Sequence, residues 1–264
     1  MQKTLPHPSE VPNRPTERSG HAPLVREPVV VLGGFLSHGL LYRALANHLR
    51  ELARSEVAIV PTTAVDWLAA PMPAGWLPVL HRLRRTVRAA VKASPTGRAI
   101  LVAHSAGGVL GRIYLSPTPF LGTIFRGCET VSHLITLGTP HYGRDRVIYG
   151  GKLSAWAERH CPGAYFADEV AYTAVAGKAI RGSVQGSPAQ RRAYRAYRGV
   201  AGHGDDWGDG VVPLRSALLS GADPVVLDGV AHFAGAGLPW YGDREIVQLW
   251  WPAMPALPAR APSA

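Results

Sequence analysis

The hydrophobic positions of the chain form continuous apolar runs that alternate with amphipathic stripes. The runs contain many β-branched residues, which is typical of strands that are buried on both faces of a parallel sheet. They lie at residues 29–32, 57–60, 99–103, 131–137, 172–176 and 224–227. Strands separated by helices predict an α/β protein with about six mostly parallel strands and helices on both faces of the sheet.

The amphipathic stripes repeat at intervals of three and four residues, as in a helix with one buried face. Leu41, Leu45 and Leu49 mark the first of them. Helices are expected over residues 40–54, about 78–92, 106–115, 188–199, 214 to about 219 and 244–250. Each of these segments follows one of the apolar runs, so the two patterns support the same architecture.

The two ends of the chain lack both patterns. Residues 1–27 contain five prolines among polar residues, and residues 253–264 are rich in proline and alanine. Such segments do not bury enough apolar surface to fold. We therefore expect a flexible N-terminal arm, a single domain over residues 28–252 and a flexible C-terminal tail.

Residues 144–170 show only weak helical periodicity. A connection of this length inside a compact domain is usually functional. We expect it to be a lid or cap segment, and its aromatic residues Trp156, Tyr165 and Phe166 to line the substrate pocket.

The formal net charge of +10 comes from 28 basic and 18 acidic residues, and 24 of the basic residues are arginine. They are spread along the chain without a nucleic-acid motif, so we expect no nucleic-acid partner and at most a weak contact with a lipid interface. No window reaches the roughly 18 apolar residues of a transmembrane segment. The N-terminus lacks the apolar core of a signal peptide. A cytoplasmic location follows if Met1 is the true start, and a secreted one if a signal has been removed.

The chain has two cysteines, Cys128 and Cys161. Their spacing fits no metal motif. Two free thiols are the preferred interpretation, and pairing of the two remains the alternative.

The candidate chemistry centres on the apolar run at residues 99–103. Directly after it come His104, Ser105, Ala106 and two glycines, small enough for a sharp turn into a helix. Such a turn exposes the serine at the tip, next to the first amides of the helix. Ser105 is therefore the candidate nucleophile.

A serine hydroxyl needs a base, and the base needs an orienting acid. Asp209 and His232 follow later positions at the sheet edge, and the chain order Ser, Asp, His is that of the α/β-hydrolases. His203 is the competing base. Asp205 and Asp206 are competing acids, and an Asp cluster in a glycine-rich loop is also compatible with a turn or a calcium site.

The oxyanion of an acyl transfer needs two N–H donors. One is expected to be the amide of Ala106, directly after the nucleophile. The other is expected from the loop after the first strand, Gly33-Gly34-Phe35, and we choose the amide of Phe35.

Several motifs together resemble the α/β-hydrolase family, in particular bacterial triacylglycerol lipases and esterases. They are Gly33-Gly34-Phe35, the segment 103–108 around Ser105, Leu137-Gly138-Thr139-Pro140-His141-Tyr142-Gly143, Gly208-Asp209-Gly210-Val211-Val212-Pro213 and His232. Two positions depart from the usual pattern: Gly33 stands where a His is common, and Ala103 replaces the first Gly of the commonest elbow. Asp66-Trp67 and Trp240-Tyr241-Gly242 are also similar to uncharacterised lipase-like hydrolases of plants and photosynthetic bacteria.

The residues and the resemblance together predict a serine hydrolase that cleaves a small or lipid carboxylic ester through an acyl-enzyme. Neither a cofactor nor a metal is expected. The alternatives are another acyl hydrolase of the same fold, acting on amides, thioesters or glycolipids, and a non-catalytic lipid- or protein-binding module.

Overall fold

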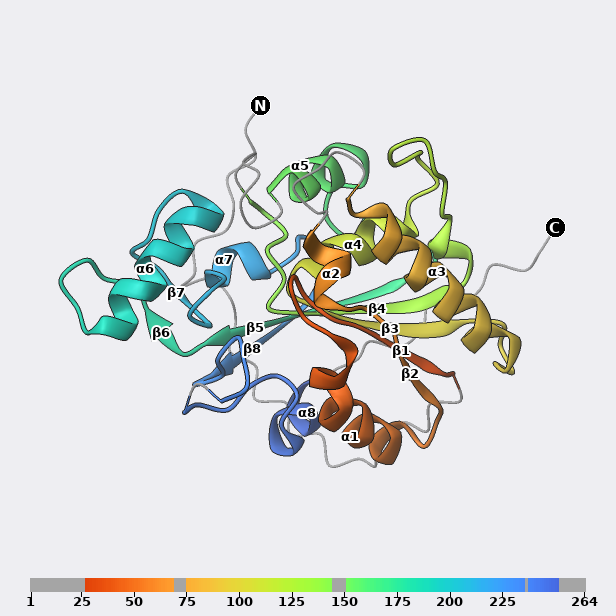
Figure 1. Cartoon of the computed structure of the whole chain (residues 1–264), viewed down its shortest axis with the longest axis horizontal. Helices are drawn as coiled ribbons and strands as arrows, with labels where there is room; N and C mark the ends of the chain where they lie inside the picture. The colour runs from red at the N-terminus through yellow and green to blue at the C-terminus, as the bar shows by residue number, and fades with distance from the viewer. Residues whose placement is uncertain (1–26, 69–74, 144–150, 236, 252–264) are drawn as a thin grey trace.

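A computed structural model describes residues 27–68, 75–143, 151–235 and 237–251 of the chain. Six strands form a parallel sheet in the order β2-β1-β3-β4-β5-β8 (Figure 1). They are β1 (Val29–Leu32), β2 (Val57–Ile59), β3 (Ala99–His104), β4 (Val131–Leu137), β5 (Ala171–Lys178) and β8 (Asp223–Asp228). The six strands predicted from the apolar runs are confirmed, and so is the predicted α/β fold.

The helices form a layer on each side of this sheet (Figure 1). They are η2 (Gly39–Tyr42), α1 (Arg43–Ala53), α2 (Ala64–Leu68), α3 (Leu77–Lys92), α4 (Ala106–Leu115), η3 (Gly127–Glu129), α5 (Gly151–His160), α6 (Pro188–Ala201), α7 (Leu214–Ala217) and α8 (Arg244–Trp250). All six predicted helices are present, and the one expected from 214 to about 219 is the short helix α7. No helix in the described ranges is long and apolar enough to span a membrane.

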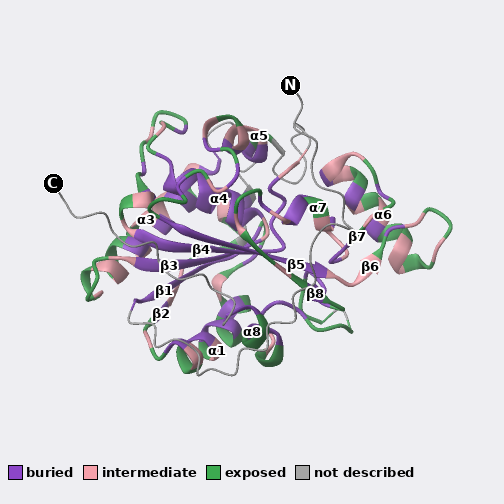
Figure 2. Cartoon of the chain, turned by 180° about the vertical axis from the view of Figure 1, so that it is seen from behind, coloured by how far each residue is buried: buried purple, intermediate pink, exposed green. Residues whose placement is uncertain are grey.

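Two apolar clusters, one on each face of the sheet, make up most of the core (Figure 2). The first joins α3, α4 and α5 to the sheet through residues such as Leu83 and Leu110. The second joins α1 and α8 to the opposite face through residues such as Leu49 and Trp250. The central strands are buried on both sides, which explains their continuous apolar sequence.

Helix α4 is buried along its whole length, and glycines let it lie close to the sheet. A Cβ atom added to Gly107 would lie 2.5 Å from the carbonyl oxygen of Gly33, in the loop after β1. Only a residue without a side chain permits this approach. The N-terminus of α4 is thereby fixed at the carboxyl ends of β1 and β3.

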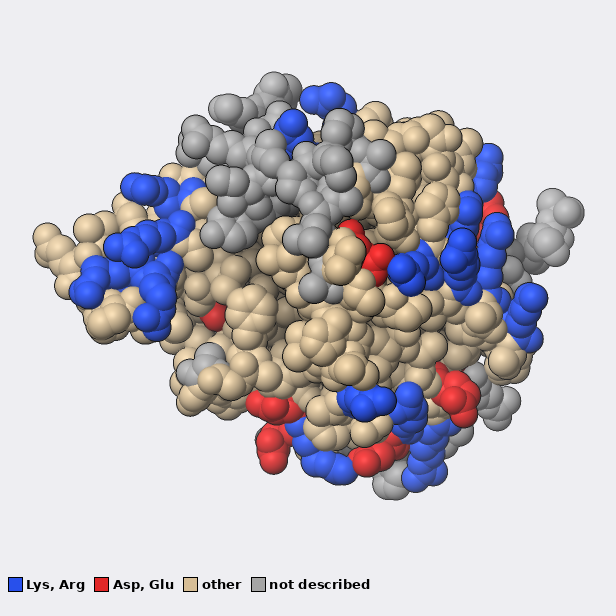
Figure 3. All heavy atoms as spheres, in the orientation of Figure 1, with Lys and Arg blue, Asp and Glu red and all other residues tan. Residues whose placement is uncertain are grey.

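A small lobe follows β5 and was not predicted as a sheet. Strands β6 (Ile180–Arg181) and β7 (Trp207–Gly208) pair antiparallel, and α6 connects them. Figure 3 shows basic side chains over α6, and other basic groups over α3 and α1, on the face in view. The positive charge of this face is divided among separate elements rather than concentrated in one tract.

The predicted lid segment is only partly described. Residues 144–150, the N-terminal arm up to residue 26 and the tail lie outside the described residues. The rest of the segment, residues 151–170, contains α5 and the loop that follows it. Both parts pack into the core, and Leu153 and Ala157 are buried residues of α5. Cys161 is also buried there, and both it and Cys128 are free thiols.

Candidate active site

Ser105 occupies a sharp turn between β3 and α4. Its backbone has φ 54° and ψ −130°, a conformation that non-glycine residues rarely adopt. The amide of Ser105 donates to the carbonyl of Leu137 at 2.9 Å, which holds the turn against the end of β4. The strand, the strained serine and the buried helix form the strand–turn–helix that presents a nucleophile at a sheet edge.

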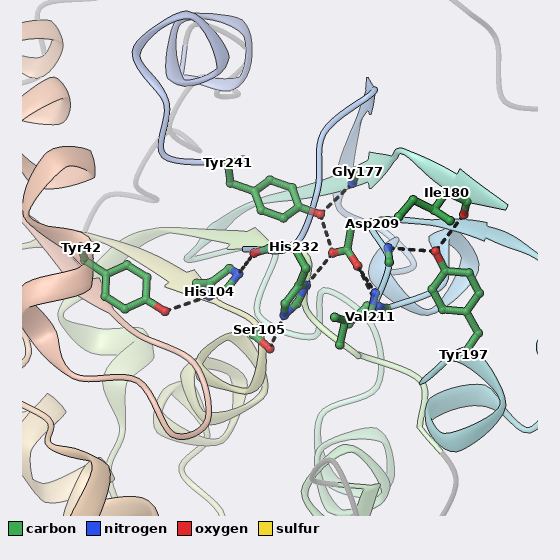
Figure 4. A network of polar contacts seen from close by, with 12 residues as sticks. Tyr42, His104, Ser105, Gly177, Ile180, Tyr197, Asp209, Val211, His232 and Tyr241 are labelled. Atoms are coloured by element: carbon green, nitrogen blue, oxygen red, sulfur yellow. Dashed lines mark hydrogen bonds and ion pairs between the residues drawn. The ribbon is translucent and has the colours of Figure 1, made fainter. Parts of the chain in front are cut away.

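Three side chains meet at this turn (Figure 4). Oγ of Ser105 lies 3.0 Å from Nε2 of His232, and Nδ1 of His232 lies 2.6 Å from Oδ2 of Asp209. A carboxylate only accepts hydrogen bonds, so Nδ1 carries the ring proton and Nε2 offers a lone pair to the serine hydroxyl. His232 and Asp209 are each 2% exposed, whereas Ser105 is partly exposed. The serine can therefore meet a substrate while its partners stay shielded from water.

The carboxylate of Asp209 is held by four donors. Oδ1 accepts from the amides of Val211 and Val212 at 3.0 and 2.7 Å. Oδ2 accepts from His232 and also from the hydroxyl of Tyr241 at 2.8 Å. Burial, and secondarily the charge of Asp209, raise the pKa of Tyr241 well above its ordinary value. Tyr241 therefore remains protonated and donates.

The backbone also links the acid to the base. The amide of His232 donates to the carbonyl of Asp209 at 2.9 Å. The hydroxyl of Tyr197 in α6 accepts from the amide of Gly210 and donates to the carbonyl of Ile180. The lobe behind the site thus fixes the loop that carries Asp209.

The competing candidates are engaged elsewhere. Asp205 forms an ion pair with Arg181, and Asp206 accepts from the amide of Trp207 and lies 3.6 Å from His203. Across the described ranges, no group of three or more His, Cys, Asp and Glu side chains could hold a metal ion.

The loop after β1 passes directly over the serine. A Cβ atom added to Gly34 would lie 2.8 Å from Cβ of Ser105. The Gly34 amide donates to the hydroxyl of Tyr42 at 2.9 Å, so it is already used. Within the described part of the chain, the amides of Phe35 and Ala106 donate to no protein acceptor. Both predicted oxyanion donors therefore have an unused N–H.

The predicted substrate-binding aromatics do not gather at this site. Arg98, just before β3, donates to the carbonyl of Glu169, just before β5, at 2.6 Å. The segment with Tyr165 and Phe166 therefore lies at the amino-terminal edge of the parallel sheet, opposite to Ser105. Phe166 is buried in the core there, and Tyr165 is exposed.

Trp156 instead packs within α5 and against a neighbouring loop. Its ring lies 4.4 Å from that of His160 and 5.2 Å from that of Phe120. Two exposed aromatic side chains lie near the site instead: the Phe233 ring is 4.6 Å from the His232 ring, and Phe35 follows Gly34 in the loop over Ser105 and packs on two tryptophans. Phe233 follows His232 directly in the chain, which is the signal that could have identified it.

The strand order and the turn that carries Ser105 are those of an α/β-hydrolase fold. The structure is similar to the lipase BlEst2 of Bacillus licheniformis in its mature form, with a TM-score of 0.54 and 19% identity over 84% of this chain and 89% of that one. It is also similar to the propeptide form of that lipase, with a TM-score of 0.55 and 17% identity over 95% of this chain and 54% of that one. At this identity the likeness establishes the fold. No protein-family model matches the chain. No curated protein matches it either.

Proposed function

We propose that the protein is a serine hydrolase that cleaves carboxylic esters through an acyl-enzyme. The observation that carries the proposal is the hydrogen-bonded arrangement of Ser105, His232 and Asp209 at a strained strand–turn–helix. The hydrogen bonds orient the three side chains as nucleophilic catalysis requires.

In the first half of the reaction, Oγ of Ser105 attacks the acyl carbonyl and its proton passes to Nε2 of His232. Asp209 stabilises the imidazolium that forms. The negative oxygen of the tetrahedral intermediate accepts hydrogen bonds from the amides of Ala106 and Phe35. The bond to the alcohol oxygen then breaks, His232 protonates that oxygen, and the acyl group stays on the serine.

In the second half, water replaces the alcohol. His232 takes a proton from water as the oxygen attacks the acyl carbonyl, and a second tetrahedral intermediate forms in the same place. Its collapse breaks the bond to Ser105, whose oxygen recovers a proton from His232. The carboxylic acid leaves and the enzyme returns to its starting state.

The nearby apolar side chains support an ester with an apolar acyl or alcohol part. Phe35 is 38% exposed and Phe233 is 55% exposed, and they come from the loops after β1 and β8. Exposed aromatic side chains at a catalytic serine favour an apolar substrate. We assign these two residues, in place of the three predicted aromatics, to substrate contact.

The test is covalent labelling by a fluorophosphonate together with hydrolysis of a p-nitrophenyl ester. The label is expected on Ser105, and Ser105→Ala should lower turnover by roughly a millionfold. Ser220→Ala, at an exposed serine at the amino-terminal edge of the sheet, is the matched control and should behave as the unchanged protein. Turnover that persists in Ser105→Ala would contradict the assignment. Parallel assays of matched ester, amide and thioester substrates separate ester hydrolysis from the other acyl-transfer reactions.

A further inference from the structure

His104, next to the candidate nucleophile, is hydrogen bonded at both ring nitrogens. Nε2 lies 3.1 Å from the carbonyl oxygen of His232, and Nδ1 lies 2.9 Å from the hydroxyl of Tyr42 (Figure 4). The side chain is 2% exposed. A buried polar side chain with two specific partners is held in one orientation.

The chemistry of these partners fixes the direction of every bond. The carbonyl of His232 only accepts, so Nε2 of His104 carries the proton. Nδ1 of the neutral ring is then an acceptor, and Tyr42 donates to it. The amide of Gly34 donates to the oxygen of Tyr42. A single chain of hydrogen bonds thus runs from the amide of Gly34 through Tyr42 and His104 to the carbonyl of His232, and each group donates to the next.

The surroundings of this hydrogen-bond chain keep the His104 ring and the Tyr42 hydroxyl uncharged. Burial, and secondarily the nearby His232, lower the pKa of His104 well below its ordinary value. Burial raises the pKa of the Tyr42 hydroxyl. The other rings around His104 are those of Phe233, Trp240 and Tyr241, at 6.0 to 6.3 Å. His104 therefore holds one tautomer and does not compete for the proton of Ser105.

The two ends of the chain are parts of the proposed reaction centre. At one end, the carbonyl of Gly34 accepts from both the amide and the hydroxyl of Ser37, so the peptide groups on both sides of Gly34 are fixed. The amide that follows belongs to Phe35. At the other end, the amide of His232 is bound to Asp209 and its carbonyl to His104, so both of its backbone groups are held.

We infer that Tyr42 and His104 are positioning residues that hold the oxyanion loop and the base in one fixed arrangement around Ser105. The inference rests on the proposed function. It assigns a role to two residues that do not touch the substrate, because they act through Gly34 and His232.

The first test is a pair of conservative variants that break the same link. Tyr42→Phe removes the hydroxyl and keeps the ring. His104→Gln keeps an N–H that can reach the carbonyl of His232 but removes Nδ1, the ring acceptor that Tyr42 uses. Each is expected to lower kcat on a p-nitrophenyl ester by about ten- to a hundredfold while KM changes less than about threefold, because small displacements of a catalytic group act mainly on the transition state.

Combination of the two variants gives the decisive measurement. Because both variants break the bond between Tyr42 and His104, the double variant should lose no more kcat than the worse single variant. His104→Leu, which also removes the donor to His232, should lose more than His104→Gln. Additive losses, or a fall in thermal stability with kcat unchanged, would overturn the inference.

Tyr142→Phe is the matched control. The Tyr142 hydroxyl accepts from the amide of Ser220 at 2.8 Å. Tyr142→Phe therefore removes a hydrogen bond of the same kind that is not part of the Gly34–Tyr42–His104–His232 hydrogen-bond chain. It should lower stability and leave kcat unchanged. The Ser105→Ala variant separates the two proposals. If Ser105→Ala stays active, the proposed function is wrong. If Ser105→Ala is inactive and Tyr42→Phe keeps full kcat, only the positioning role is wrong.

Discussion

Tyr241 donates its hydroxyl hydrogen to Oδ2 of Asp209, the oxygen that also accepts from His232. The same hydroxyl accepts from the buried amide of Gly177 at 2.8 Å. In Tyr241→Phe we expect kcat to fall roughly tenfold, the equivalent of about 1.4 kcal/mol for one orienting bond. The free energy of unfolding should fall by about 1–3 kcal/mol, because the Gly177 amide loses its partner. Ester hydrolysis and urea unfolding measure the two effects.

The comparison for this prediction is Tyr197→Phe. Its hydroxyl bridges Ile180 and Gly210 and so reaches Asp209 only through the backbone. The same atom is removed at both positions, but the loss of kcat should be smaller in Tyr197→Phe. Equal losses would show that Tyr241 acts as ordinary packing.

The strained backbone of Ser105 predicts a difference between two inactive variants. Ser105→Ala retains the side-chain clash at φ 54°, whereas Ser105→Gly removes it. We expect Ser105→Gly to be more stable than Ser105→Ala by about 1 kcal/mol, the low end of the usual cost of such a conformation. Urea unfolding of the two variants measures the difference. Equal midpoints would mean that the turn carries no strain.

Two glycines one turn apart on α4 should respond oppositely to alanine. The new Cβ of Gly107→Ala would meet the backbone oxygen of Gly33 at 2.5 Å, and that oxygen cannot move without displacing the loop over Ser105. A loss of about 1–3 kcal/mol is expected from such overpacking, together with a loss of activity. In Gly111→Ala the nearest atom is a terminal methyl of Leu134 at 3.0 Å, which can shift.

Gly111→Ala is therefore the internal control for that experiment. Replacement of glycine by alanine inside a helix is favourable by up to about 1 kcal/mol. The variant should be as stable as the unchanged protein or slightly more so, with full activity. Similar destabilisation at both positions would contradict the geometry described for the start of α4.

The stability of the fold should depend on pH through two buried histidines. Burial lowers the pKa of His104 and of His141 well below the ordinary value, and the nearby His232 and Arg112 lower them further. Both rings stay neutral in the folded chain, while the unfolded chain protonates them as the pH falls through about 6.5. The unfolded state then binds up to two more protons, so the free energy of unfolding falls by up to about 2.7 kcal/mol per pH unit below pH ~6.

Above pH ~7.5 these two groups contribute no pH dependence, because both states are neutral. Urea midpoints between pH 8 and pH 5 test the prediction. His141→Asn should reduce the slope by about half, whatever its effect on stability at pH 8. A flat profile between pH 6.5 and pH 5 would show that the folded chain accepts these protons.

Most of the sheet could be predicted from the sequence because each central strand is buried on both faces and reads as a continuous apolar run. The same pattern predicted that Ser105, Asp209 and His232 lie at the edge of the sheet, because each comes directly after a strand or beside a defined turn. Helix α2 was not predicted, because its five residues are too few for a periodic pattern.

The tyrosines of the site could not be predicted. Tyr42 lies 62 residues from His104, and Tyr241 lies 32 residues from Asp209. In the sequence, each tyrosine stands where an aromatic side chain could equally be an ordinary core residue. Only the fold shows which group its hydroxyl contacts. The same limit applies to Tyr165 and Phe166, because aromatic composition does not indicate which edge of a parallel sheet a segment reaches.

The parallel arrangement of the sheet also determines when the site can form. His232 and Ser105 are 127 residues apart, and His232 follows β8, the strand that pairs with β5 at the end of the sheet. Contacts between such distant segments form late in folding, because a long loop must close before they are made. Under the proposed function, recovery of p-nitrophenyl ester hydrolysis after dilution from denaturant should follow the last strand pairing and come later than the first gain of helical signal.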